Sequence, residues 1–194
     1  MALALAAACG EEKRTLKPVP PGPVPDTFRV AFETTKGRFV VEAYRAWAPL
    51  GAKRFYELAS MGAFDDNSFY RVTPNFVVQW GTPGDPALTA ILDSVRIPDE
   101  QRLVKNERGT VAFAQEGKDS RSHSVFINRR NATHLDSTGF TPFGRVVEGM
   151  AVVDSIKWPY KERPDHHMIA TIGNRYLKRN YPLTDYVRTA TVVR

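Results

Sequence analysis

Short runs of alternating apolar and polar residues dominate the chain, which is the pattern of half-buried β-strands. Residues 27–33 alternate cleanly, and residues 37–44 continue as the second strand of a hairpin. The β-rich residues 186–193 predict a last strand. Strands at both ends of a domain favour a closed sheet, because closure removes exposed strand edges.

Helical periodicity occurs at three places. Pro49 suits the first turn of a helix whose apolar stripe ends before Gly62. Residues 146–156 predict a second helix, which we expect to begin near Glu148. Further on, apolar residues recur at helical spacing over residues 169–177 until a proline ends the pattern. The sequence therefore predicts a mainly β fold with helices as covers.

Composition indicates one folded domain. The chain has 194 residues, of which 42% are hydrophobic and 25% charged, which is enough for one good core. The net charge of +6 raises the question of nucleic acid. However, the basic residues are scattered, and their densest group, residues 175–179, lies on an amphipathic helical pattern without any recognition module. We expect no nucleic-acid binding, whereas contact with anionic lipid or acidic chains stays open.

The N-terminus carries the only cysteine. Residues 1–10 read MALALAAACG, and the part ending at Cys9 resembles a bacterial lipobox. We interpret residues 1–9 as a truncated lipoprotein signal, with Cys9 as the lipidated residue and the cell envelope or periplasm as the location. The alternative is a plain apolar N-terminus on a cytoplasmic protein. A single cysteine excludes disulfides within the chain.

Residues 10–26 contain five prolines within a polar stretch. Such a segment favours the extended polyproline conformation, so we predict a semi-rigid linker that ends where the folded domain, residues 27–194, begins. A disordered tail and a ligand for a proline-binding module are the alternatives.

The candidate chemistry lies in residues 69–81, which read FYRVTPNFVVQWG. Pro74 and the residue after it suit the middle of a tight turn between two short strands. An arginine, Arg71, and a glutamine, Gln79, interrupt an otherwise apolar surface. Alternation places Val77 on the same face as Gln79, and Phe76 points either toward that face or toward the core.

With this spacing the hairpin resembles the active-site hairpin of the cyclophilins, a family of peptidyl-prolyl cis-trans isomerases. Further blocks resemble the same family in the same order: GTVAFAQ at 109–115, SVFIN at 124–128 and LD at 135–136. The run FGRVVEGM at 143–150 and an opening hairpin with its helix extend the likeness to roughly residues 28–158.

The resemblance implies a closed eight-stranded antiparallel barrel capped by two helices, here with an extra C-terminal helix. It also implies an isomerase that assists protein folding by accelerating rotation about X–Pro bonds, with proline-containing polypeptides as substrates. We expect a monomer without cofactor or metal. Two alternatives are a catalytically weak module that binds proline-containing segments and a general holdase.

The chemistry needs no nucleophile, because the site must only favour the twisted amide over both planar forms. Arg71 is the candidate donor to the prolyl nitrogen, which gains a lone pair when resonance is broken. Gln79 would orient Arg71 or bond the substrate backbone, and Phe76 would help grip the proline ring. The resemblance implies a groove lined by Val77, Ala114, Gln115, Ser124, Phe126, His134, Leu135 and Phe140.

Four of these positions differ from the family pattern. Val77 replaces a methionine, Ser124 replaces a second groove glutamine, and His134 replaces a tryptophan that binds cyclosporin. Phe140 falls near the family's pocket histidine. We expect these changes to leave the isomerase activity in place and to weaken cyclosporin binding.

Other stretches also contain residues often found in binding sites. The adjacent pair His166 and His167 is expected in a solvated loop, because neighbours in sequence seldom chelate one metal. His123 lies in an expected groove loop, as does His134, where either could modulate substrate binding. Residues 81–86 are interpreted as two Gly–Pro-type turns, since they lack the ending of a phosphate-binding loop.

Overall fold

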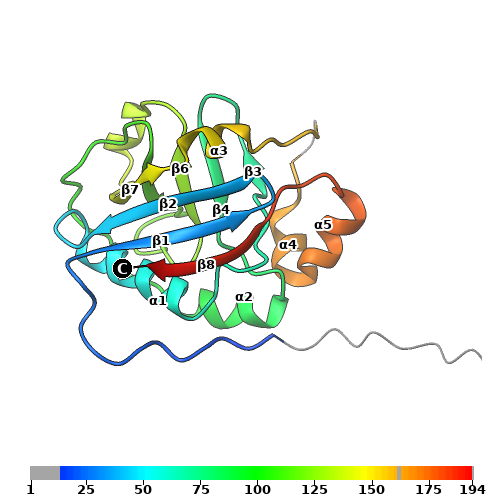
Figure 1. Ribbon diagram of the computed structural model, residues 1–194, viewed down its shortest axis with the longest axis horizontal. Coiled ribbons are helices and arrows are strands. Elements are labelled where there is room, and N and C mark those ends of the chain that lie inside the picture. Colours follow the sequence, from blue (N-terminus) through cyan, green and yellow to red (C-terminus); the bar gives the residue numbers. More distant parts are fainter. Residues whose placement is uncertain (1–13, 161–162, 194) are drawn as a thin grey trace, which may run out of the picture.

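The computed structural model describes residues 14–160 and 163–193 of the chain. Eight antiparallel strands form one sheet in the order β3-β4-β6-β5-β7-β2-β1-β8 (Figure 1). Their bounds are β1 Thr27–Thr34, β2 Gly37–Tyr44, β3 Arg71–Val72, β4 Val77–Trp80, β5 Thr110–Phe113, β6 Val125–Asn128, β7 Pro142–Glu148 and β8 Val187–Val193. This confirms the predicted mainly β fold and its eight antiparallel strands.

The sheet curls until the segment that precedes β3 meets the segment that precedes β8. Ser68 and Tyr186 form an antiparallel bridge there. The backbone nitrogen of Phe69 donates to the Asp185 carbonyl at 2.9 Å, and that of Val187 donates to the Asn67 carbonyl at 2.8 Å. The closure predicted from the terminal strands is thus made by a short bridged segment rather than by a full strand pair.

The core is aromatic because the inward positions of the strands carry large rings. The rings of Phe32 and Phe39 stack at 4.9 Å across the first hairpin, and Trp80 meets Phe32 edge-on at 5.4 Å. From the first helix, Phe55 reaches Phe143 on β7 at 4.8 Å. All five side chains are fully buried, so they fix the register of the strands that carry the site.

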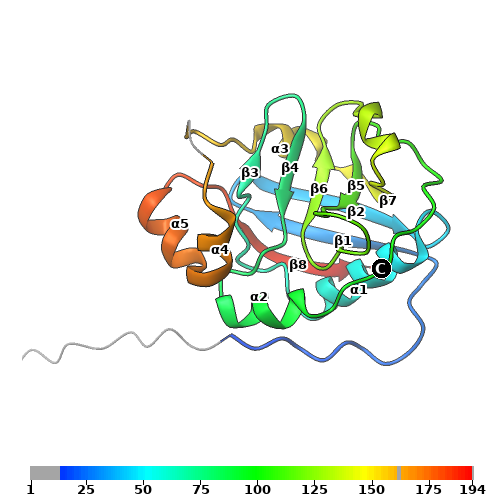
Figure 2. The same cartoon turned by 180° about the vertical axis from the view of Figure 1, so that it is seen from behind.

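Several helices surround the sheet (Figures 1 and 2). They are α1 Pro49–Ser60, α2 Pro86–Asp93, α3 Met150–Ser155, α4 His166–Ile172 and α5 Asn174–Asn180, with a short 3-10 helix, η1, at Thr133–Ser137. In Figure 1, α1 and α2 lie below the strands, α3 lies above them, and α4 and α5 pack against one end. Helix α1 begins at the proline that predicted it.

The second predicted helix begins later than expected. Strand β7 runs through Glu148, whose Cα pairs with that of Val40, and α3 starts only at Met150. Between them Gly149 has φ +77°, and a Cβ on it would lie 2.4 Å from the Arg38 carbonyl. Only glycine fits this close approach, and it ends the strand.

The predicted C-terminal helix is two helices. Gly173 separates α4 from α5 with φ +69° and ψ −148°, which no helix contains. The pair His166–His167 opens α4, so the prediction of a loop is wrong, although both residues are exposed as expected. Helix α2 was missed altogether: Asp85 Oδ1 accepts from the backbone nitrogen of Ala87, which makes Asp85 an N-cap rather than part of a turn.

The proline-rich segment lies against the domain where the structure describes it. Leu16 and Val24 pack on the core, and the backbone nitrogen of Lys17 donates to the Met61 carbonyl at 3.0 Å. Arg14 forms an ion pair with Asp65 at 3.4 Å. The predicted signal and Cys9 lie outside the described residues.

None of the helices that the structure describes is long and apolar enough to cross a membrane.

Candidate active site

The predicted hairpin forms as β3 and β4. Asn75 takes a left-handed conformation with φ +55° at the turn, and the backbone nitrogen of Thr73 donates to the Val77 carbonyl at 2.9 Å. Arg71 and Gln79 are Cα partners across the two strands. Partnered residues point to the same face of a sheet, and the Arg71 Nη1 accordingly donates to Gln79 Oε1 at 3.1 Å.

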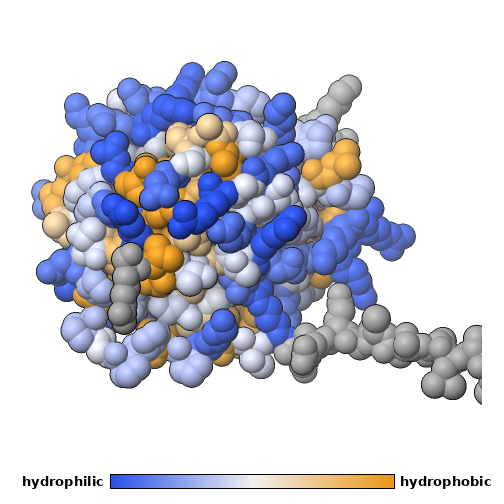
Figure 3. All heavy atoms as spheres, in the orientation of Figure 1, coloured by the Kyte–Doolittle hydropathy of each residue, from blue (hydrophilic) through white to orange (hydrophobic). Residues whose placement is uncertain are grey.

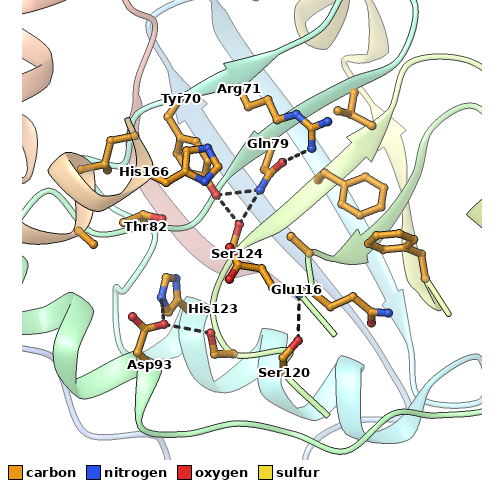
Figure 4. A pocket seen from close by; sticks show the side chains of 18 of the residues that line it. Tyr70, Arg71, Gln79, Thr82, Asp93, Glu116, Ser120, His123, Ser124 and His166 are labelled. Carbon is orange, nitrogen blue, oxygen red and sulfur yellow. Dashed lines mark hydrogen bonds and ion pairs between the residues drawn. The ribbon is translucent and has the colours of Figure 1, made fainter. Parts of the chain in front are cut away.

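Gln79 is held at both ends of its amide. Its Nε2 donates to the Tyr70 hydroxyl at 3.0 Å and to Ser124 Oγ at 3.2 Å, and these two hydroxyl groups bond each other. Figure 4 shows this chain of hydrogen bonds running from Arg71 through Gln79 to Tyr70 and Ser124. Burial raises the pKa of the Tyr70 hydroxyl, so it stays protonated. The amide orientation therefore aims its oxygen at Arg71.

An apolar pocket lies beside Arg71. Val77, Phe126 and Leu135 are buried in one cluster. Phe76 joins the same cluster, which resolves its direction in favour of the cavity, and Phe140 meets Phe126 edge-on at 5.5 Å. The pocket wall predicted near Phe140 is therefore present. A phenylalanine forms it where the family pattern has a histidine.

The pocket opens into a cavity of about 860 Å³. Ala114 and Gln115 line it, as predicted, and the buried Gln115 Oε1 has no partner among the described residues. His134 does not line the cavity; its ring lies 5.3 Å from that of Phe76. Of the predicted groove residues, the structure thus brings all but His134 to one cavity, and His134 is exposed beside Phe76.

The guanidinium of Arg71 is only partly paired. Burial lowers its pKa, and the charge of Arg163 adds to the effect, yet a guanidinium stays charged at neutral pH. Its Nε is buried without a partner among the described residues, and its Cζ lies 5.9 Å from the centre of the Phe76 ring. A charged donor is therefore available at the rim of an apolar pocket.

Sequence reasoning missed two other residues at this cavity, and it placed His123 in a groove loop without its partners. Tyr70 had no assigned role, although it precedes Arg71. His166 lies at the cavity on α4 with its ring 5.3 Å from that of Tyr70. At the far side, His123 Nε2 lies 2.8 Å from Asp93 Oδ1 and its Nδ1 lies 3.0 Å from the Gly81 carbonyl, which ties α2 to β6 and holds the pKa of Asp93 low.

No local sequence pattern indicates the contacts that the two histidines form. The partner of His123 belongs to the missed helix α2, and His166 belongs to a helix read as a loop. Tyr70 alone could have been found, because β3 alternation buries the residue before Arg71 while the neighbouring strand offers Gln79 as its partner.

The arrangement suits an amide that must twist. A fixed positive donor at the rim can meet a nitrogen lone pair, while the apolar pocket beside it holds a ring the size of proline. No group of three potential metal ligands occurs in the described part of the chain.

Comparison with known proteins agrees with this geometry. Residues 29–173 match the family model described as cyclophilin type peptidyl-prolyl cis-trans isomerase/CLD. The chain is 34% identical to the peptidyl-prolyl cis-trans isomerase-like 1 of Aspergillus niger over 70% of its length and 86% of the relative. It is 31% identical to a peptidyl-prolyl cis-trans isomerase of Acinetobacter baylyi over 66% of its length and 70% of the relative.

A solved structure shares the fold. The cyclophilin type isomerase of Cryptosporidium parvum superposes with a TM-score of 0.65 at 18% identity, over 87% of this chain and 98% of its own. The fold, the family match over residues 29–173 and the named relatives agree: the chain belongs to the cyclophilin family of peptidyl-prolyl cis-trans isomerases.

Proposed function

We propose that Arg71 carries the isomerase activity of this chain by donating to the prolyl nitrogen of proline-containing polypeptides. Rotation about an X–Pro bond faces a barrier of roughly 18–20 kcal/mol, because resonance flattens the amide. A donor that bonds the pyramidal nitrogen stabilises the twisted amide and neither planar form. The observation that carries the proposal is the half-buried Arg71 guanidinium, which is held by Gln79 at 3.1 Å and lines the cavity beside the apolar pocket.

The remaining residues have supporting roles. Phe76, Val77, Phe126 and Leu135 would grip the proline ring, since they form one apolar cluster next to the guanidinium. Gln79 acts as a positioning residue for Arg71. Gln115 would pair with an extended substrate through its backbone, since it lines the cavity.

Ser124 has a different role from the groove glutamine that it replaces. Its hydroxyl bonds Tyr70 and receives Gln79 Nε2, so it holds Gln79 in place rather than facing the substrate. A related observation concerns the substrate class: one structure of the Cryptosporidium parvum isomerase was determined in the presence of the dipeptide Ala-Pro. We infer that this chain likewise takes proline-containing segments, as a monomer and without a cofactor.

The test is cis-to-trans exchange of an Ala-Pro-Phe peptide. We expect Arg71→Ala to lose roughly 10²–10³-fold in kcat/KM, the usual effect of removing a transition-state donor. Arg71→Lys should recover little, because an ammonium lacks the planar fork that meets Gln79. Arg145→Ala, which removes an exposed arginine on β7, is the matched control.

Two results would contradict this proposal. Full activity in Arg71→Ala would exclude Arg71 as the donor. Peptide binding without any acceleration by the unaltered chain would favour the alternative, a module that holds proline-containing segments.

We further propose that Cys9 is acylated, so that the chain acts on polypeptides in the cell envelope. The support is the lipobox-like sequence around Cys9, followed by a linker rich in proline. Mass analysis of the protein from its native membrane fraction tests this. An unmodified Met1 in the soluble fraction would overturn the proposal and favour the cytoplasmic alternative.

A further inference from the structure

Helix α5 carries three exposed cations on one face. Arg175, Lys178 and Arg179 stand at i, i+3 and i+4, a spacing that makes them neighbours. Leu177, on the opposite face, is fully buried against the domain. None of the three cations forms an ion pair with another residue in the described ranges. The face is therefore an unneutralised positive surface.

The helix itself does not explain these charges. Cations favour the C-terminal end of a helix, which accounts for Lys178 and Arg179. Arg175, however, lies in the first turn, where the helix dipole opposes a positive charge, and neighbouring like charges destabilise a helix. The nearby carboxylates already have partners: Asp66 accepts from Asn174 at 2.9 Å, and Asp165 caps α4. An external anion would relieve this repulsion.

A hollow between α4 and α5 shows what kind of anion fits. It measures about 620 Å³ and is lined by apolar side chains together with two arginines. Its lining consists of Met168, Ile172, Arg175, Tyr176, Arg179 and Asn180. A phosphate bonded to an apolar body matches this combination better than a free inorganic anion does, because arginine forks bind phosphate oxygens while Met168 and Ile172 offer apolar contact.

Aromatic and apolar side chains border the same face. The rings of Trp158, Tyr160, Tyr181 and Tyr176 form a chain of contacts at 5.2, 5.1 and 5.7 Å. Leu183 follows α5 and is 70% exposed. Figure 3 shows hydrophobic and strongly hydrophilic residues side by side at the end of the molecule that carries α5. Tryptophan and tyrosine are enriched at the boundary between lipid and water.

The N-terminal segment reaches the domain close to this face. Arg14 pairs with Asp65, whose neighbour Asp66 holds Asn174 at the start of α5. Cys9 precedes Arg14 by only five positions, so the chain between them spans at most about 17 Å. An acyl chain on Cys9 would therefore keep α5 near the bilayer surface. This step rests on the acylation proposed above, whereas the preceding four do not.

We propose that the α4–α5 face, defined by Arg175, Lys178 and Arg179 with the hollow beside them, docks on a bilayer that contains anionic phospholipid. Helix α4 also contributes His166 and Ile169 to the catalytic cavity. Docking through this face thus holds the cavity beside the membrane, where exported chains emerge.

The test uses the full chain with Cys9→Ser, so that binding does not depend on acylation. Sedimentation with vesicles compares phosphatidylcholine alone with a mixture containing phosphatidylglycerol, at about 0.1 M salt where exposed charges still act over roughly 10 Å. We expect binding only to the anionic vesicles. The triple variant Arg175→Ala, Lys178→Ala, Arg179→Ala should bind roughly 100-fold more weakly, at about fivefold for each cation near the surface.

The control variant removes three exposed cations elsewhere, Lys105→Ala, Arg130→Ala and Arg145→Ala, and has the same net charge. It should bind nearly as well as the parent, and both variants should keep the peptide exchange activity, which shows that they fold. Equal loss in the two variants would overturn the proposal in favour of unspecific charge attraction, as would equal binding to neutral vesicles.

The outcomes also separate this proposal from its neighbours. Capture of an acidic peptide such as polyglutamate, without vesicle binding, would overturn it in favour of an acidic protein partner. If native protein proves unacylated while the Cys9→Ser chain binds anionic vesicles, the anchor proposal fails and the docking proposal stands. If native protein is acylated while its Cys9→Ser form ignores the vesicles, the anchor proposal stands and the docking proposal fails.

Discussion

At the scale of single residues, the site depends on the hydroxyl of Tyr70. This group accepts from Gln79 Nε2 at 3.0 Å and thereby fixes which end of the amide faces Arg71. Tyr70→Phe keeps the ring and removes the acceptor. We expect a loss of about 1 kcal/mol in the free energy of unfolding and a several-fold lower kcat with little change in KM.

Peptide exchange and thermal unfolding of that variant measure both effects. Tyr56→Phe is the matched control, because it removes a hydroxyl from a tyrosine that packs edge-on against Phe28 at 5.1 Å, away from the cavity. If Tyr70→Phe retains full activity, Ser124 alone suffices to hold the amide, and the positioning role of Tyr70 is wrong.

A second residue, His166, should make the protein sensitive to acid. Burial lowers the pKa of its imidazole, and the charge of Arg71 lowers it further, whereas Glu116 and Asp165 act in the opposite direction. The folded protein therefore binds this proton less readily than the unfolded chain does. Stability from His166 is fully present above about pH 6.5, the usual histidine value, and is lost as the pH falls toward the lower pKa of the folded state.

NMR titration of the His166 ring measures this pKa directly. Arg71→Gln should raise it, and Glu116→Gln should lower it, because each removes one of the opposing charges. His166→Gln should flatten the decline in melting temperature between pH 6.5 and pH 5. A ring that titrates at or above pH 6.5 in the unaltered protein would contradict the prediction.

At the scale of elements, the position of α4 and α5 depends on one close backbone approach. A Cβ on Gly173 would lie 2.0 Å from the Gly84 carbonyl, which also accepts from the backbone nitrogen of Asn174 at 2.9 Å. Gly173→Ala therefore combines a steric clash with a strained φ. We expect it to cost more than the roughly 1–3 kcal/mol of backbone strain alone and to loosen α4 and α5 from the sheet.

Hydrogen exchange shows where that loss occurs. Protection should fall within residues 166–180 and persist in β1 and β2, whose residues form the core. Gly22→Ala is the control, because Gly22 also has a positive φ, +116°, but a Cβ placed on it would meet no atom within 4 Å. Uniform loss of protection across the chain would show that the C-terminal helices belong to the same cooperative unit as the barrel.

The sequence could predict those elements whose two ends have local causes. Alternation predicted β2 to its last residue, since both of its ends are turns with local causes. The break at Gly173 had one local signal, a glycine of the kind that ends helices, but the helical period continues through it from Ile169 to Leu177 and hid the break. Helix α2 did carry local signals, Asp85 as a cap and Pro86 in the first turn, which the reading of residues 81–86 as turns overlooked.

From the residue pattern alone, the candidate site was predictable only where it lies on one hairpin, whereas the resemblance supplied the groove residues between 114 and 140. Arg71, Gln79 and Val77 share a face because strand period and turn chemistry decide it. His166 and His123 come to the cavity from segments about 50 to 90 residues away in the sequence, and no short-range pattern encodes that approach.

At the scale of the whole molecule, the first question is where the domain begins. The sequence placed this boundary at residue 27, where alternation starts. Yet Leu16 and Val24 pack on the core, Lys17 bonds Met61, and the Arg45 guanidinium bonds the Val24 carbonyl at 3.2 Å. The proline-rich segment is therefore fastened to the domain at two places, around Leu16 and around Val24, while its five prolines stay exposed.

Two truncated chains test this. Residues 14–194 should have a free energy of unfolding about 1–3 kcal/mol higher than residues 27–194, since burial of an aliphatic side chain contributes on that order. Leu16→Ser within the longer chain should remove much of the difference. Peptide exchange should be equal in both, because the segment contacts α1 and its surroundings rather than the cavity. Equal stability of the two chains would show that the segment is a free spacer. The distance from Cys9 to α5 would then no longer be limited by a contact between Arg14 and the domain.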